Sequence, residues 1–336
     1  MNITYHSSDT FSSVLAVSMA SIMENNKAID DITFYVLEKH ISEDNKTKLC
    51  QMVAEYGRRL VFIPMPNMQD EFNLPIAQVK AKWILDSYCR LFLGSILPNN
   101  VERVLYLDCD TLCNDSLDEL WNIDLHNNYC AAVADALGEK YYQLFEMNKT
   151  SRYCNSGMVL FDLKKWREDN IENEIAQYVR NHNGYVFFME QSVMNIILQD
   201  RILILHPRYN VYTLISALKY LDLKTLRHCN RFYTEVEYNE AKEKPCIIHL
   251  TNLFLIKGRP WIEDNNHPFK NLFLHYRQLT PWRESPLQQN NYGILKKIQF
   301  ALISVAPKKL LLWILGIVYE YIRPITIARQ QKNRQN

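Results

Sequence analysis

The sequence predicts an α/β fold, in which a parallel sheet is covered by helices and followed by a helical tail. The first hundred residues alternate between strand-like and helix-like segments, which is typical of parallel strands joined by crossover helices. The chain has 336 residues, of which 48% are hydrophobic and 22% charged, so it can bury a sizeable core. We expect one domain over residues 1–275 and a tail over residues 276–336.

Each element follows from a local pattern. In the first half, the expected strands are 1–8, 31–40, 59–65 and the run that ends at Asp108, and the expected helices are 12–26, 43–57 and 80–97. In the second half, residues 169–182 and 189–199 have helical patterns, whereas 201–210 and 245–252 are strand-like. Gly57 stands where a glycine commonly ends a helix.

Composition excludes several classes of function. The net charge of +1 argues against a nucleic-acid-binding protein. Only eight glycines occur, and neither a dinucleotide-binding G-x-G-x-x-G nor a Walker A loop is present. None of the eight cysteines forms a C-x-x-C pair, and the N-terminus lacks the features of a signal peptide. We therefore expect reduced thiols, mostly in the core, in a cytoplasmic protein.

The C-terminal segment has a charge pattern of its own. From position 291 onward it carries eight basic residues and one acidic residue, which is a net charge of +7 against −6 for the rest. Its longest clean apolar run, Leu310–Tyr319, has ten residues, whereas a membrane-spanning helix needs about 20. We expect an interfacial helix on an anionic membrane surface. The alternatives are a helix packed on the domain and a re-entrant or spanning segment.

Two carboxylates, Asp108 and Asp110, follow the apolar run 104–107. Alternate residues of a strand point to the same face, so these carboxylates can converge. Carboxylate oxygens suit a hard cation such as Mg²⁺ or Mn²⁺. In open α/β sheets ligands bind beyond the carboxyl ends of the strands, where the turn at residues 6–9 would also lie. The structural alternative is a turn in which Thr111 and Asn114 form local hydrogen bonds.

Several functions are compatible with a cation at this place. A haloacid-dehalogenase-like phosphatase would use Asp108 as its nucleophile, but it needs a later acidic pair, and no convincing one occurs. A nucleotide-sugar transferase would use the cation to hold the diphosphate of the donor. It needs a third ligand, for which His249 at the end of a strand is the candidate. A catalytically silent nucleotide-sugar-binding or scaffold protein is the third possibility.

Five motifs occur in a fixed order: SSDTFSSVLAVSMASIMENN at 7–26, SYCRLFLGSILPNNVERVLYLDCDTL at 87–112, CNSGMVLFDLKKWR at 154–167, MEQSVMN at 189–195, and IIHLTN followed by KGRPW within 247–261. With this set the chain resembles glycosyltransferase family 8, in particular the bacterial lipopolysaccharide galactosyl- and glucosyltransferases. The resemblance covers roughly residues 1–275. It implies a GT-A fold, which is a Rossmann-like mixed sheet flanked by helices, and a metal-dependent retaining hexosyl transfer.

The resemblance also implies a role for each matching residue. Asp108, Asp110 and His249 would bind Mn²⁺ or Mg²⁺. The residues expected around the nucleotide and its diphosphate are His6, Ser8, Asp9, Arg90, Cys109, Lys257 and Arg259. The residues expected around the donor sugar, or in catalysis, are Asp135, Asn155, Gly157, Glu190 and Gln191.

Three positions depart from the pattern of the family. The last motif is longer than usual and has Arg259 where lysine is expected, so Lys257 and Arg259 are both candidates for the contact to the diphosphate. Glu190 stands where related enzymes often have aspartate. Ser8 replaces a commonly acidic residue, which weakens the expected contact to uracil.

The resemblance further implies UDP-galactose or UDP-glucose as the donor, and a glycolipid or oligosaccharide such as lipooligosaccharide core as the acceptor. The sequence offers no well-placed nucleophile, so we favour a front-face reaction over attack by Glu190 or Asp135. The tail would hold the enzyme on the inner face of the bacterial cytoplasmic membrane. Deletion of residues 291–336 would then release it from membranes and leave donor hydrolysis intact.

Overall fold

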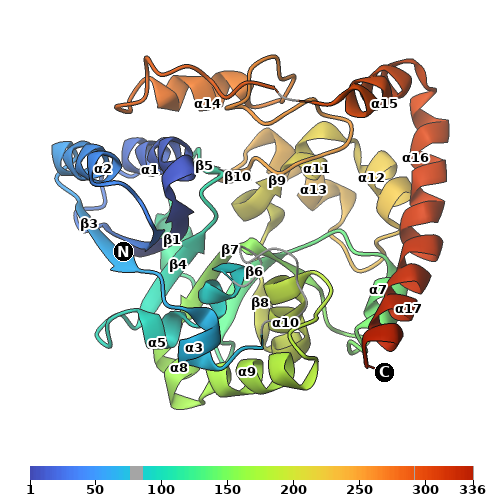
Figure 1. Cartoon of the computed structure of the whole chain (residues 1–336), viewed down its shortest axis with the longest axis horizontal. Helices are drawn as coiled ribbons and strands as arrows, with labels where there is room; N and C mark the ends of the chain where they lie inside the picture. Colours follow the sequence, from blue (N-terminus) through green and yellow to red (C-terminus); the bar gives the residue numbers. More distant parts are fainter. Residues whose placement is uncertain (76–85, 291, 336) are drawn as a thin grey trace.

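A central sheet of seven strands organises the protein, in a computed structural model that describes residues 1–75, 86–290 and 292–335 (Figure 1). The strand order is β3-β2-β1-β4-β7-β6-β8. The strands are β1 (Asn2–Ser8), β2 (Thr33–Lys39), β3 (Arg59–Pro64), β4 (Arg103–Leu107), β6 (Cys130–Ala134), β7 (Cys154–Asp162) and β8 (Ile202–Ile204). The strands from β3 to β4 run parallel, as the alternating pattern predicts, whereas β7 is antiparallel to both of its neighbours. The sheet is therefore mixed.

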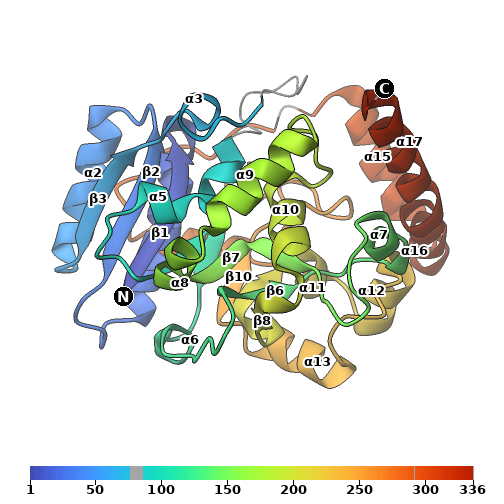
Figure 2. The ribbon, with the colours of Figure 1, turned by 90° about the horizontal axis from the view of Figure 1, so that it is seen from below.

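Helices cover both faces of this sheet (Figure 2). Alternate residues of β4 face opposite sides: Leu105 packs in the cluster that holds α1 and α2, and Tyr106 in the cluster that holds α8, α9 and α10. The helices are α1 (Ser12–Asn25), α2 (Glu43–Glu55), α3 (Met68–Phe72), α5 (Leu93–Ile96), α6 (Asp118–Trp121), α7 (Glu139–Leu144), α8 (Leu163–Glu168), α9 (Ile171–Asn181), α10 (Met189–Leu198), α11 (Thr213–Ala217), α12 (Tyr220–Arg227), α13 (Glu235–Glu243), α14 (Lys270–Arg277), α15 (Ile294–Val305), α16 (Lys308–Ile317) and α17 (Arg323–Gln335).

A small second sheet connects distant parts of the chain. Its order is β5-β10-β9, formed by β5 (Thr111–Cys113), β10 (Ile247–His249) and β9 (Val211–Tyr212). β10 runs antiparallel to β5, with His249 opposite Thr111, and the Leu250 amide donates to the Asp110 carbonyl at 2.8 Å. This pairing brings the end of β10 to the end of β4.

Two predicted elements are wrong in part. Within the described part of segment 80–97, a 3-10 helix (Ser87–Leu91) and the short α5 meet at Phe92, so this part is not one continuous helix; positions 80–85 lie outside the described residues. At the break the Phe92 amide bonds the Cys89 carbonyl, three residues back, which is the tighter 3-10 pattern, and the buried Arg90 donates from Nε to the Ser87 carbonyl. In segment 201–210 only β8 is a strand, because a 3-10 helix begins at Pro207, which has no amide hydrogen to donate to a sheet.

The tail helices form one edge of the molecule (Figure 1). α16 continues through a π-helical turn (Val318–Ile322) into α17, and α16 packs on α12. The helical stretch Lys308–Gln330 has 23 residues, and an 18-residue segment within it has a mean hydropathy of 1.5, so its length and composition would suffice to cross a membrane. This stretch is longer than the ten-residue run that the sequence singles out, because Glu320 and Arg323 interrupt the apolar pattern without ending the helix.

Candidate active site

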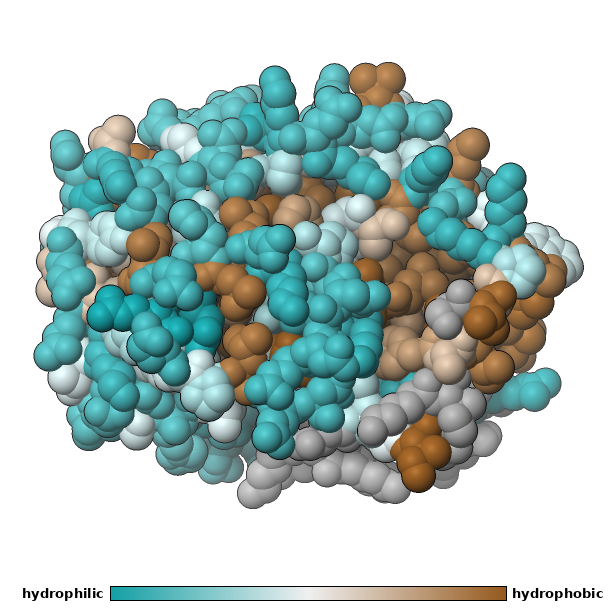
Figure 3. All heavy atoms as spheres, turned by 90° about the horizontal axis from the view of Figure 1, so that it is seen from above, coloured by the Kyte–Doolittle hydropathy of each residue, from teal (hydrophilic) through white to brown (hydrophobic). Residues whose placement is uncertain are grey.

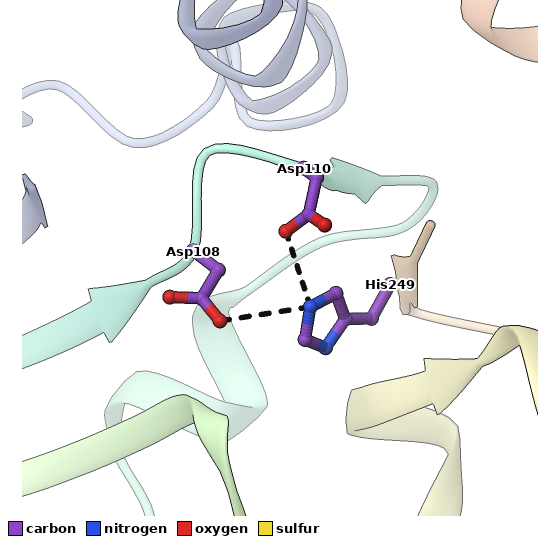
Figure 4. Close-up of side chains that lie close together, drawn as sticks. All are labelled: Asp108, Asp110 and His249. Carbon is purple, nitrogen blue, oxygen red and sulfur yellow. Dashed lines mark ion pairs between the residues drawn. The ribbon is translucent and has the colours of Figure 1, made fainter. Parts of the chain in front are cut away.

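Two carboxylates and one imidazole converge beyond the carboxyl end of β4. Asp108 follows β4 directly, Asp110 comes just before β5, and His249 ends β10. The Nε2 atom of His249 lies 3.1 Å from Asp110 Oδ1 and 3.6 Å from Asp108 Oδ2 (Figure 4). One ligand atom from each of the three side chains lies within 4.8 Å of the other two. The structure therefore brings together the three residues expected to bind a metal.

Gly157 on β7 leaves space beside this cluster. Its carbonyl accepts a hydrogen bond from the Asp108 amide at 2.8 Å. A Cβ atom built at Gly157 would lie 2.8 Å from Asp108 Oδ2 and 2.7 Å from His249 Nδ1, which is closer than real Cβ contacts. Glycine is thus required where β7 passes the cluster. Gly157 therefore contacts the candidate metal ligands, although the family resemblance groups it with the donor sugar.

Asp110 and His249 stabilise each other's charged forms. Burial alone would raise the pKa of Asp110, but His249 and Arg259 hold it well below its ordinary value. Burial alone would lower the pKa of His249, but the two aspartates raise it. Nδ1 of His249 is buried and has no hydrogen-bond partner among the described residues. Carboxylate oxygens and an imidazole nitrogen at these distances, with free space kept by Gly157, fit a divalent cation such as Mn²⁺ or Mg²⁺.

Arg90 connects the metal-ligand candidates to the start of α10. One of its terminal nitrogens lies 3.0 Å from Asp108 Oδ1, and the other donates to the Ser156 carbonyl at 2.9 Å. The same side chain stacks on Tyr106 and lies 3.8 Å from Glu190. Since Arg90 is only 7% exposed, it is the buried counter-charge for two carboxylates.

A second hydrogen-bonded group joins the residues expected around the donor sugar. The Gln191 amide nitrogen donates to Asp135 Oδ2 at 3.1 Å, and its oxygen accepts from the Asn155 side chain at 3.3 Å. Asn155 Oδ1 in turn accepts from the Gly157 amide and from Asn210. Asp135 after β6, the first residues of β7 and the first turn of α10 therefore form one network.

Only some of the residues expected around the nucleotide lie next to the metal-ligand candidates. Arg259 pairs with Asp110, whereas Lys257 pairs with Asp264 and turns away from the cluster. The geometry thus favours Arg259 for a contact near the metal. Ser8 binds the hydroxyl of Thr10, and the exposed Asp9 accepts hydrogen bonds from Ser42 and Asn45. No described contact joins Ser8 or Asp9 to the cluster.

His6 and Cys109 connect β1 to the aspartate pair. The Cys109 thiol donates to the His6 carbonyl at 3.0 Å. Burial, with Arg90 nearby, lowers the pKa of His6 to about 4, so its imidazole is neutral at neutral pH. A cavity of about 490 Å³ opens at the carboxyl ends of β2 and β3, with Lys39 and Asp86 in its wall. This edge of the sheet is where a nucleotide would bind in an open α/β fold.

The sequence interpretation missed three polar residues of this region. Ser156 accepts from Arg90 through its carbonyl, and Ser87 donates to Glu190 Oε2 at 2.5 Å. Asn210 is fully buried and donates to Asn155 at 2.9 Å, while its own Oδ1 has no partner among the described residues. Ser87 and Ser156 lie inside the motifs that carry the resemblance. Asn210 lies outside them, and only its burial identifies it.

A buried histidine near the site makes stability depend on pH. Burial lowers the pKa of His267 to about 4, and its Nε2 bonds the Thr213 hydroxyl at 3.0 Å. The unfolded chain takes up a proton below pH 6.5, but the folded chain does so only near pH 4. The free energy of unfolding should therefore fall as the pH drops through this window, by at most about 3 kcal/mol.

Urea denaturation of wild type and His267→Gln across this pH window checks that prediction. The Gln variant should show a smaller decline in stability, because its side chain does not titrate. The exposed His126, replaced by Gln, is the matched control and should leave the decline unchanged. Equal slopes for wild type and His267→Gln would contradict the prediction.

A family model described as glycosyl transferase family 8 matches residues 2–264. The chain belongs to this family. General stress protein A of Bacillus subtilis (strain 168) is 28% identical to it, over 84% of this chain and 94% of its own length. The lipopolysaccharide 1,2-glucosyltransferase of Escherichia coli (strain K12) is 27% identical, over 84% of this chain and 79% of its own length. Family membership confirms the resemblance and excludes the phosphatase interpretation.

Comparison with solved structures agrees with this family assignment. The crystal structure of the galactosyltransferase LgtC in complex with donor and acceptor sugar analogues matches this structure with a TM-score of 0.68. The sequences are 24% identical, and the match covers 84% of this chain and 99% of that chain. The GT-A fold expected from the sequence is thereby confirmed.

Proposed function

We propose that this member of family 8 transfers glucose or galactose from a UDP-sugar to a lipid-linked glycan, in a reaction that depends on Mn²⁺ or Mg²⁺ and retains the anomeric configuration. The observation that carries the proposal is the convergence of Asp108, Asp110 and His249 beside Gly157. Relatives that are named as lipopolysaccharide sugar transferases, such as the lipopolysaccharide 1,2-glucosyltransferase, support the choice of donor sugar and acceptor class.

The chain would use this cluster to hold the cation. A divalent cation bound there would neutralise the charge that builds up on the leaving diphosphate. Arg259, which pairs with Asp110 and is partly exposed, would add a second positive group for the same diphosphate. Lys257, paired with Asp264 in this arrangement, is the less favoured candidate for that contact.

The donor-sugar side supports a front-face reaction. Glu190 is 7% exposed. Its carboxylate accepts a hydrogen bond from the Ser87 hydroxyl and lies beside the Arg90 guanidinium. Asp135 accepts hydrogen bonds from the Ala136 amide and from Gln191. Both carboxylates are thus held by neighbours rather than free to attack a sugar. We propose that the leaving phosphate oxygen takes the proton of the acceptor; a covalent glycosyl adduct on Glu190 or Asp135 in mass spectrometry would contradict this.

The tail supports a membrane-associated, cytoplasmic location on the inner face of the bacterial membrane. Apolar side chains gather on the side of the molecule where the tail helices lie (Figure 3). Leu310, Trp313, Ile314 and Ile325 are exposed and follow a helical period along one stripe. A cavity of about 540 Å³, lined mainly by apolar residues, lies between these helices and the loop after β10. An apolar stripe of this kind with basic flanks suits an anionic membrane surface and a lipid-linked acceptor.

Replacing Trp313 and Ile325 together with Gln should weaken binding to vesicles that contain anionic lipid. Loss of two large apolar side chains corresponds to about 3 kcal/mol, or about a hundredfold in affinity. Co-sedimentation with such vesicles measures the effect. Val236→Gln is the matched control, because Val236 is also exposed but lies on α13. Equal binding by wild type and the double variant would contradict a role for the stripe.

Release of UDP from a panel of UDP-sugars, measured with Mn²⁺ or with EDTA, tests the proposed function as a whole. Turnover of UDP-glucose or UDP-galactose that requires metal would support it. Metal-dependent UDP binding without turnover, even when oligosaccharide acceptors are added, would instead favour the catalytically silent sugar-binding protein. Turnover that EDTA does not affect would overturn the metal-dependent mechanism.

A further inference from the structure

The buried face of the tail meets both segments that carry the donor-sugar residues. The π-helical turn Val318–Ile322 and α17 pack against α7, which begins four residues after Asp135. Arg323 lies over the rings of Phe187 and Phe188, directly before α10 with Glu190 and Gln191. This part of the tail therefore contacts both segments that carry the candidate donor-sugar residues.

Glu320 makes the most specific of these contacts. Although it carries a carboxylate, it is only 4% exposed, and its Oε1 accepts a hydrogen bond from the Lys140 amide at 2.9 Å. This amide is in the first turn of α7, where backbone N–H groups have no partner inside the helix. A Cβ at Gly138 would lie 2.8 Å from Cδ of Glu320 and overlap its Oε2. The turn after Asp135 is thus shaped to receive a carboxylate from the tail.

Tyr319 holds the same region from the neighbouring side. Its carbonyl accepts from the Tyr141 hydroxyl at 3.1 Å, and the two rings lie 4.9 Å apart. Arg227 from α12 stacks on the Tyr319 ring at 4.3 Å. Phe188, which Arg323 covers, has a φ of 60°, a left-handed conformation that a bulky residue adopts only when its surroundings impose it. These contacts are directional and polar, unlike the apolar packing of Leu312 on α12 one helical segment earlier.

We propose that Tyr319, Glu320 and Arg323 are positioning residues, which hold the 135–138 turn and the start of α10 in the geometry that the donor sugar requires. This inference rests on the proposed function, because it assigns the tail a part in the same pocket. The exposed apolar stripe and the buried polar contacts lie on different faces of one helix. The expectation that residues 291–336 can be removed without loss of donor hydrolysis is therefore replaced by the opposite one.

Three variants of the full-length chain separate positioning from stability. Glu320→Ala removes the acceptor of the Lys140 amide, and it should change the KM or kcat of UDP-sugar hydrolysis by about tenfold or more. Glu320→Gln keeps an acceptor oxygen and should restore most of the loss. Leu312→Ala is the control: Leu312 is 1% exposed on the same helix, so its truncation should lower the melting temperature but leave the KM for the donor unchanged.

Hydrogen exchange of residues 135–145 and 186–191 gives a readout that needs no turnover. Exchange should rise in Glu320→Ala and stay at the wild-type level in Leu312→Ala. If Glu320→Ala does not fold, Tyr141→Phe removes the hydroxyl that binds the Tyr319 carbonyl, and it should raise exchange in the same segments. Equal exchange and equal KM in Glu320→Ala and Leu312→Ala would overturn the proposal. If wild type itself shows no turnover, that result counts against the proposed function only. Hydrogen exchange would still test whether the tail holds these two segments.

Discussion

Asp110→Asn is expected to abolish metal-dependent release of UDP while the protein stays folded. Asparagine has nearly the same shape, so the change removes a charge and leaves the packing intact. Asp110 is 8% exposed and faces both His249 and Arg259. A bound cation contributes several kcal/mol of charge stabilisation, so losing about 4 kcal/mol would slow turnover about a thousandfold.

The rate of UDP release at saturating Mn²⁺ measures this effect. Asp124→Asn is the matched control, because Asp124 is an exposed aspartate outside the cluster, whose carboxylate is 76% exposed. That variant should keep the wild-type rate, and both variants should show the same circular dichroism spectrum. Asp110→Asn that turns over within a few-fold of wild type would show that the aspartate pair is not the metal site.

Gly157→Ala is expected to disable the same site by adding a single methyl group. The new Cβ would come within 2.8 Å of Asp108 Oδ2 and 2.7 Å of His249 Nδ1, so both candidate ligands would have to move. Disturbing the neighbours of metal ligands typically lowers metal affinity by about 10–100-fold, and displacing the ligands themselves should cost at least as much. The concentration of Mn²⁺ needed for half-maximal turnover should rise accordingly.

Gly293→Ala is the control for this substitution. A Cβ at Gly293 would meet nothing within 4 Å, so the change adds the same methyl group in open space. Its Mn²⁺ dependence should match that of wild type. If Gly157→Ala binds Mn²⁺ as wild type does, the space beside the cluster is not needed for the cation.

The parallel half of the sheet could be predicted because each of its strands is marked by a pattern in its own short segment of sequence. Each of β1, β2 and β3 is a short apolar run, and each run is followed by a helix-like segment. The place of β7 could not be predicted, because its apolar run carries no sign of the strand beside which it inserts. The same limit applies to β5, which has three residues and no pattern of its own, although its pairing with β10 brings His249 to Asp110.

The sequence predicts which residues form the candidate site better than it predicts how they are arranged. The motif order gave Asp108, Asp110 and His249, which the structure places in one cluster. The sequence left Lys257 and Arg259 equivalent, and only the fold of the loop after β10 separates them. The contact of Glu320 could not be predicted, because its partner, the amide of Lys140, lies 180 positions away in the sequence.

Isothermal titration of UDP, with Mn²⁺ and then with EDTA, tests most directly whether the aspartate–histidine cluster is a metal-dependent nucleotide site. We expect UDP to bind wild type tightly only when Mn²⁺ is present, and His249→Ala to lose most of this metal-dependent affinity. His249→Ala should remain folded by circular dichroism. Binding of UDP that is equally tight with EDTA, or unchanged in His249→Ala, would contradict the account.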